Sequence, residues 1–278
     1  MIDSFRYHYE KYINNLNNKF INACHANNNE YIKKLLNDNE INVNHKTDLG
    51  ICAFALALAN DNIELLKMLI NHPSSDINIT FGGNTILHHA CLNGLKDVVE
   101  LILVHQNLNI NKINEYGKTA FYLACEKGYL DIVETLVKSS HDLNVHIKSY
   151  YSVDALQMSC VRGKYDIVKY LLNLDYDINE LDQNGMSLMA LACNHNNNDI
   201  AELLLNQPYI DINNYDKQGW PAVFFACVND MDIIDKLLER DDLNIMIKTV
   251  TGVSLLGLAT IHNKVKIIDF INKKSSVK

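Results

Sequence analysis

The sequence predicts an all-α protein in which short helices stack in pairs along the chain. The first reason is a sequence unit that returns every 33 to 35 residues. The second is the content of that unit, which is clearest over residues 116–137: a turn at Tyr116-Gly117, a short apolar helix, a break at Gly128 and a second helix. Because so short a helix pair cannot bury its own apolar face, each pair must stack on a neighbour.

Eight copies of the unit align on the position that Thr119 occupies in the fourth copy. The aligned positions, called anchors below, are Asn18, Cys52, Thr85, Thr119, Asp154, Ser187, Pro221 and Ser254. Successive anchors lie 34, 33, 34, 35, 33, 34 and 33 residues apart. We therefore predict a repeat array over residues 17–273, an amphipathic helix over residues 1–16 that caps it, and a tail over residues 274–278.

The first helix of each unit begins near its anchor and ends nine residues later. The residue two places after the anchor is always apolar, and the residue five places after it is Ala in seven units and Ser159 in one, which lets stacked helices approach closely. Nine places after the anchor stand residues that tolerate positive φ, as a helix end commonly needs: Asn27, Asp61, Gly94, Gly128, Gly163, Asn196, Asp230 and Asn263. In the seventh unit Asn229 is an alternative turn residue.

The second helix of each unit carries an apolar stripe with the 3.6-residue period of a half-buried helix. We predict these helices at Ile63–Ile70, Val98–Leu103, Ile132–Val137, Ile167–Leu172, Ile200–Leu205, Ile233–Leu238 and Ile267–Ile271.

Composition limits the classes of function. The formal net charge of −8 and the pI near 5.7 argue against a nucleic-acid partner, because such proteins usually show a basic face. No apolar run approaches the roughly 18 residues of a membrane span, and the first residues lack the apolar stretch of a secretory signal. The seven cysteines are an odd number and do not look like a disulfide framework. We expect an intracellular protein, cytoplasmic or nuclear, with no membrane insertion.

The repeat resembles the ankyrin repeat, which has a turn and two helices in about 33 residues. The family's G-x-T-P-L-H-x-A signature survives best at residues 83–90 (GNTILHHA), and Gly117 to Gly128 give a second good match. No unit has Pro at the signature position, and only His88 keeps the signature His. The resemblance implies an all-α ankyrin-repeat solenoid with β-hairpin-like finger loops, in which His88 ties neighbouring repeats by hydrogen bonds.

Three patterns suggest chemistry, and we interpret each as structural. Six cysteines share the position six places after the anchor (Cys24, Cys91, Cys125, Cys160, Cys193 and Cys227). Stacked helices lie about 8–10 Å apart, too far for a shared disulfide or zinc site, so these thiols are predicted to pack. His88, His89 and Cys91 offer at most two converging ligands, and Gly117-Lys118-Thr119 lacks the earlier glycine of a phosphate-binding loop. We predict no metal and no cofactor.

The resemblance also implies where a partner binds. In ankyrin arrays the finger tips and the exposed ends of the first helices line a concave groove. By position, the fingers contribute Phe81, Tyr116, Tyr150, Tyr151, Lys217 and Trp220, and the helix ends contribute Asn93, Glu126, Lys127, Arg162, His195, Asn229 and His262. Aromatic residues and Arg are enriched at interface hot spots; the alternative is that these aromatic rings merely cover neighbouring fingers.

We therefore expect a monomeric, non-catalytic protein-interaction module, such as a scaffold or adaptor, that binds a protein partner through the groove and the fingers. One alternative is a pathogen effector or regulatory inhibitor that uses the same surface. Another is the accessory part of an enzyme whose catalytic domain lies outside this chain. No insertion longer than about two residues interrupts the repeats, and no G-x-S-x-G or H-E-x-x-H motif is present.

Overall fold

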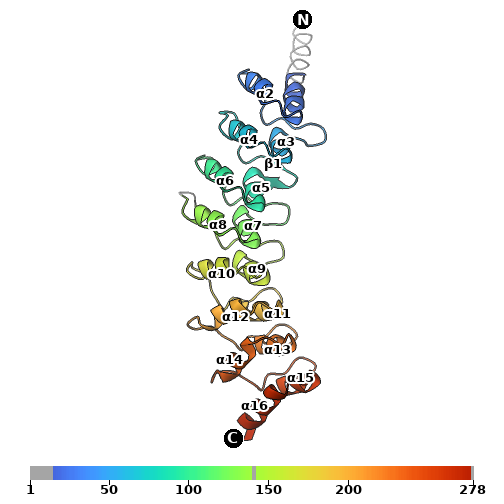
Figure 1. Cartoon of the computed structure of the whole chain (residues 1–278), viewed down its shortest axis with the longest axis vertical. Helices are drawn as coiled ribbons and strands as arrows, with labels where there is room; N and C mark the ends of the chain where they lie inside the picture. Colours follow the sequence, from blue (N-terminus) through green and yellow to red (C-terminus); the bar gives the residue numbers. More distant parts are fainter. Residues whose placement is uncertain (1–14, 140–141, 277–278) are drawn as a thin grey trace. The chain divides into compact units, whose positions relative to one another are not determined.

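The computed structural model describes residues 15–139 and 142–276. The chain divides into two compact units: unit 1 comprises residues 1–123 and 131–144, and unit 2 comprises residues 124–130 and 145–278. Each unit is built from short α-helices that follow one another in pairs (Figure 1). Within the described residues, no helix is long and apolar enough to cross a membrane.

Unit 1 begins with a helix over residues 15–25. It is followed by α2 (Asn29–Leu36), α3 (Ala53–Ala59), α4 (Ile63–Ile70), β1 (Thr80–Phe81), β2 (Asn84–Thr85), α5 (Ile86–Asn93) and α6 (Lys96–Ile102). Within this unit α3 packs on α4, α5 packs on α6, and α4 packs on α6. The boundary between the two units passes through the next pair, α7 (Ala120–Lys127) and α8 (Leu130–Val137).

Unit 2 continues with four further helix pairs. They are α9 (Ala155–Val161) with α10 (Tyr165–Leu171), α11 (Leu188–Asn194) with α12 (Asn198–Leu205), α13 (Ala222–Val228) with α14 (Ile233–Glu239), and α15 (Leu255–Ile261) with α16 (Val265–Ser276). The first helices pack in the order α9, α11, α13 and α15, and the second helices pack in the order α10, α12 and α14. Stacking of like helices, as the short pairs require, therefore holds within this unit.

Both predicted ends of the array differ from the observed helices. Residues 1–14 of the predicted capping helix lie outside the described residues, but residues 15–25 are helical, so this helix runs through the predicted boundary at 16/17. At the other end α16 continues to Ser276, which places the start of the predicted tail inside a helix. No Gly or Pro interrupts α16, and Lys273 and Lys274 lie in its last turn, where cations stabilise a helix C-terminus.

The turn between the two helices of each repeat follows the predicted pattern. All eight residues nine places after the anchors have positive φ, from 49° at Asp61 to 90° at Gly128. In the seventh repeat Asp230 has φ 57°, whereas Asn229 has φ −84°, so Asp230 is the turn residue. The second helices begin at the predicted residue or two residues earlier. Several of these helices begin before the apolar stripe, because an acidic residue in the first turn, such as Asp97 or Asp166, stabilises the helix N-terminus.

The core lies between stacked helices. The small residues five places after the anchors are all buried, and so are the apolar residues two places after the anchors, except Leu256 near the end of the array. Every cysteine is buried as a free thiol. Burial raises the pKa of Cys91 and Cys160 well above the usual range, which keeps these thiols protonated and supports their interpretation as packing residues.

Each finger is a minimal hairpin before the first helix. In the third repeat β1 and β2 pair antiparallel, with Thr80 opposite Thr85, and four other fingers form a single bridge between the anchor and the residue six places earlier. Two residues before each anchor from the second onward, the backbone has positive φ; the residue is Gly in six repeats and Ser152 in the fifth.

A row of asparagine side chains links the loops that lead into the fingers. Asn213 Nδ2 donates to the carbonyl of Asp242 in the next repeat (2.8 Å), and Asn213 Oδ1 accepts from the N–H of Asn244 (2.7 Å). The same pair of bonds to the following repeat, with lengths of 2.6–2.9 Å, is made by Asn44, Asn78, Asn111 and Asn179. We call this row the asparagine ladder. Because each bond joins residues from successive repeats, the ladder fixes the spacing of the loops within each unit.

Candidate protein-binding surface

Trp220 lies at the base of the seventh finger, where the local hydrogen bonds hold its backbone firmly. The Asp216 carboxylate accepts the backbone N–H of Gln218 (2.9 Å) and of Trp220 (2.8 Å), which closes the turn. The indole packs against two rings of α13, with centroid distances of 5.2 Å to Phe225 and 6.0 Å to Phe224. Trp220 and Phe225 are both half-buried, so each presents part of an aromatic surface to solvent.

Arg162 caps the C-terminal end of α9 and reaches back to the preceding repeat. Its Nη2 donates to Glu126 Oε1 over 3.0 Å. The Glu126 side chain is only 13 % exposed, whereas that of Arg162 is 56 % exposed. A guanidinium carries five N–H donors, so an exposed Arg162 in this single ion pair retains donors that face solvent. Lys127, next to Glu126, is exposed as well.

His195 occupies the equivalent helix end in the sixth repeat. Partial burial lowers the pKa of His195, and the positive charge of Arg162 lowers it further. His195 and Arg162 cap the C-terminal ends of α11 and α9, two helices that pack on each other. His195 is therefore predominantly neutral at pH 7.

Asn229 connects the aromatic cluster to this row of helix ends. It caps α13, and its side-chain amide donates to the carbonyls of Cys193 (2.9 Å) and Asn194 (3.3 Å) at the end of α11. Phe225 lies one turn before Asn229 and therefore on the same face of α13. The contacts thus run from Trp220 through Asn229 to the end of α11, immediately before His195.

The predicted finger tyrosines are exposed. In unit 2, Tyr150 and Tyr151 are 68 % and 63 % exposed, and in unit 1 Tyr116 is 51 % exposed. Lys217 is also exposed at its finger tip, and its backbone N–H donates to the carbonyl of Asn184 in the preceding finger (2.8 Å). These side chains remain accessible in their own units, as a binding role requires.

Phe81 differs from the other predicted finger residues because its ring is buried. It stacks on His89 at 4.5 Å and on Phe54 at 6.4 Å between ring centroids. The strand β1 turns this side chain toward the first helices, and His89 Nε2 lies 3.2 Å from the Phe81 carbonyl oxygen. Phe81 therefore packs the finger against the helices, and we leave it out of the surface proposed below.

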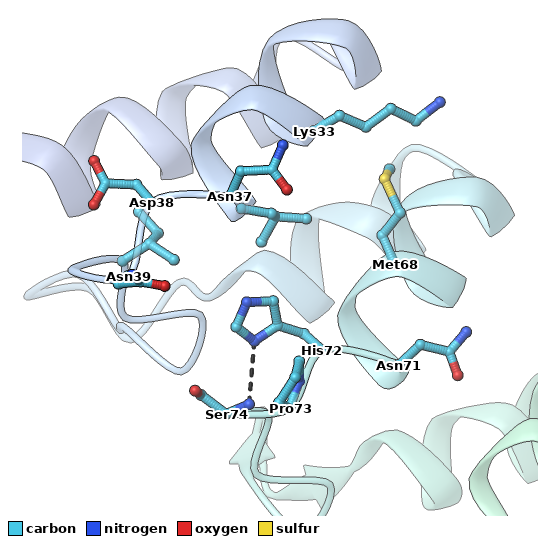
Figure 2. A pocket seen from close by; sticks show the side chains of 11 residues that line it. Lys33, Asn37, Asp38, Asn39, Met68, Asn71, His72, Pro73 and Ser74 are labelled. Carbon is cyan, nitrogen blue, oxygen red and sulfur yellow. Dashed lines mark hydrogen bonds between the residues drawn. The ribbon is translucent and has the colours of Figure 1, made fainter.

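A cleft of about 610 Å³ lies in unit 1 near the ends of α2 and α4 (Figure 2). Two of its polar side chains bond locally: His72 Nδ1 accepts the backbone N–H of Ser74 (3.2 Å), and Asp38 Oδ1 accepts that of Glu40 (3.0 Å). Lys33 points away from His72 and pairs with Glu64 at 2.6 Å. Within the described residues, no three His, Cys, Asp or Glu side chains gather into a group that could hold a metal ion.

Comparison with known proteins identifies the repeat. A family model described as "Ankyrin repeats (3 copies)" matches residues 20–114, 81–149 and 155–249, which together make up most of the chain. The chain belongs to the ankyrin repeat family. The crystal structure of the ankyrin repeat domain of Bcl-3 superposes with a TM-score of 0.69, at 22 % identity, over 80 % of this chain and 99 % of that one. The predicted fold class, an all-α ankyrin-repeat solenoid, is confirmed.

Sequence relatives match only part of their own length. The human transient receptor potential cation channel subfamily A member 1 is 29 % identical over 119 residues, which is 40 % of this chain and 11 % of the channel. Ankyrin repeat protein OPG189 of variola virus is 31 % identical over 117 residues, which is 41 % of this chain and 20 % of the viral protein. The chain thus aligns with about a fifth or less of these relatives.

The ankyrin signature residue His88 has the role that the resemblance implied. Its Nδ1 lies 2.7 Å from Thr85 Oγ1, and its Nε2 lies 3.0 Å from the carbonyl oxygen of Lys118 in the next repeat. Thr85 and His88 form a complete capping box at the start of α5. In the fifth ankyrin repeat Asp154 and Gln157 form the same capping box.

Sequence reasoning missed two features of these ankyrin repeats. Phe225 was given no role from the sequence, although its position four places after Pro221 puts its ring beside Trp220 at the surface. The asparagine ladder was not predicted, although three of its members end Asp-Ile-Asn segments at residues 76–78, 177–179 and 211–213. The signal for the ladder was the recurrence of Asn at a spacing near one repeat.

Proposed function

We propose that this chain is a non-catalytic protein-interaction module that binds a protein partner through the exposed fingers and the ends of its first helices. The observation that carries the proposal is the half-buried Trp220, which rests on Phe224 and Phe225 and adjoins the helix ends. A supported, partly exposed aromatic ring and an exposed Arg are residue types that are enriched at interface hot spots. The ankyrin repeats supply a rigid display for it, since each repeat is held by its neighbours.

The remaining parts of the proposal concern assembly and compartment. We propose a monomer that acts inside a cell without a metal or cofactor, and not on nucleic acid. The free, buried thiols support a reducing compartment, and the net charge of −8 disfavours a phosphate backbone as partner.

A pathogen effector or regulatory inhibitor is the second candidate function. The observation that favours it is the 31 % identity to the variola virus ankyrin repeat protein. It would use the same surface, so identification of the partner separates the two roles.

The experiment begins with affinity purification and mass spectrometry to find a partner, followed by binding titrations of variants. Trp220→Ala and Tyr150→Ala should each weaken binding by about 2 kcal/mol, or roughly thirtyfold. Their melting temperatures should stay near that of the wild type, because coupling in a repeat array is mainly between neighbours. Tyr165→Ala, at the exposed start of α10, is the matched control and should leave binding unchanged. A Trp220→Ala protein that melts far below wild type yet binds normally would assign the indole to packing.

A further inference from the structure

The contacts around Trp220 and Arg162 join into one continuous surface of unit 2. We call it the Arg162–Trp220 surface and define it by Glu126, Arg162, His195, Asn229, Phe225 and Trp220. Arg162 pairs with Glu126 of the preceding repeat, and it caps α9, which packs on α11, the helix that His195 caps. Asn229 binds the end of α11, and the face of α13 that carries Asn229 also carries Phe225 against the indole. The surface therefore spans successive repeats of a single compact unit.

One end of this surface is basic although the protein as a whole is acidic. Arg162 and Lys127 are exposed cations in the row of first-helix ends. The carboxylate that faces Arg162, Glu126, is mostly buried. Exposed acids of unit 2 lie on second helices, as Asp166, Asp199, Asp235 and Glu239 do, and in loops and turns, where Asp230 beside Asn229 pairs with Lys264. Because screening limits interactions between exposed charges to about 8–10 Å, this local pattern outweighs the net charge at close contact.

The other end of the surface is aromatic. Trp220 and Phe225 are half-buried, with rings 5.2 Å apart and tilted by 40°. Because the two rings are already held in position, a partner side chain can bury apolar area against them without the entropic cost of ordering them. A ligand that satisfies both ends needs a negative group and an apolar group at a defined separation.

We propose that the partner docks through an extended acidic segment in which a carboxylate binds Arg162 and an apolar or aromatic side chain packs on Trp220 and Phe225. This proposal rests on the protein-binding function above and adds the chemical class of the partner. A guanidinium with donors facing solvent is suited to bind a second carboxylate in fork geometry. Arg162 and Trp220 belong to repeats two apart, so at about 8–10 Å per stacked helix the two contacts are separated by roughly 16–20 Å. An extended segment covers that distance in about five or six residues.

The test uses synthetic peptides and the sole tryptophan of the chain, Trp220. The probe is an acidic peptide of about twelve residues with one Phe placed about six residues from a Glu-Asp pair, a spacing set by the extended-chain rise. A second peptide carries Lys in place of every Glu and Asp, and a third carries Gln and Asn. In titrations followed by Trp220 emission, the acidic peptide should bind with a Kd at least tenfold lower than that of either other peptide. Added salt should raise the Kd of the acidic peptide.

Charge reversal at one position then locates the contact. Arg162→Glu should lower the affinity for the acidic peptide at least tenfold. Lys169→Glu, an equal charge change on the exposed outer face of α10 in the same repeat, should leave it unchanged, and melting curves should show both variants folded. Equal binding of the acidic and basic peptides, equal losses in the two variants, or no binding of the acidic peptide would overturn the proposal. If Trp220→Ala weakens binding of a natural partner but Arg162→Glu does not, the protein-binding function stands and the proposal of an acidic partner segment is wrong.

Discussion

A single buried histidine joins two repeats of unit 1. His88 is 1 % exposed and contacts both Thr85 and the Lys118 carbonyl. Burial lowers the pKa of His88 from 6.5 to about 4, and the positive charges of His89 and Lys112 act in the same direction. The folded protein therefore holds a neutral ring at pH values where the unfolded chain is already protonated.

This histidine predicts a pH-dependent stability. Above about pH 6.5 both states are neutral at position 88, and its contribution to the free energy of unfolding is fully present. As the pH falls from 6.5 toward 4, the unfolded state binds the proton first, and up to about 3 kcal/mol of stability is lost. His88→Gln should flatten this dependence. It should also keep the capping box of α5, because Gln157 forms the same box at the equivalent position of the fifth repeat. Urea titrations of both proteins at pH 7 and pH 4.5 give the comparison; parallel losses in the two would contradict a neutral, buried His88.

At the scale of the element, the asparagine ladder joins the loops of successive repeats by hydrogen bonds. Asn213→Ala removes the bonds to Asp242 and Asn244, which join the loops that lead into the seventh and eighth fingers. We expect a loss of about 1–2 kcal/mol in the free energy of unfolding, since each net hydrogen bond contributes about 1 kcal/mol. Asn184→Ala, at an exposed finger position, is the control and should change stability by less than about 0.5 kcal/mol. Chemical denaturation measures both, and equal effects would mean that the ladder adds no stability.

Local chemistry made the elements predictable from the sequence. A column of Gly, Asn and Asp predicts backbone turns, because only such residues accept positive φ at little cost, and all eight have it. Apolar and small columns predict the buried faces for the same local reason. Ser152 shows the limit of this rule: it occupies a finger turn at φ 56° where six other repeats have Gly, so residue type alone did not identify it.

Contacts between repeats were the part that the sequence did not reveal. Whether an Asn amide meets a carbonyl of the next loop depends on how far one repeat is translated and rotated from the last. The same uncertainty affected the fingers, where Phe81 was predicted to face a partner and instead stacks on Phe54 and His89. The continuity from Trp220 to Asn229 likewise required three-dimensional contacts. For the candidate surface, the sequence therefore predicted which residues lie on the fingers and helix ends, but it did not predict how their side chains are oriented.

At the scale of the whole molecule, a repeat protein has no single centre that holds it together. Its stability is approximately a sum of repeat and nearest-neighbour terms, so damage to one repeat spreads mainly to adjacent ones. The division into unit 1 and unit 2 adds a specific expectation, because each unit is compact by itself. Loss of one unit should therefore leave a measurable part of the other folded.

Ala192→Asp tests this expectation. Ala192 is fully buried in α11, where the helix packs against α9 and α13, so the substitution buries an unpaired charge and should cost several kcal/mol. Hydrogen exchange followed by mass spectrometry should show lost protection in α9 to α14, with protection retained in α3 to α6 of unit 1. Asn194→Asp adds a carboxylate at the exposed end of the same helix and should leave the exchange pattern near that of the wild type. If Ala192→Asp instead removes protection from both units to the same extent, the chain unfolds as one cooperative body, and stability cannot be assigned to local stacking.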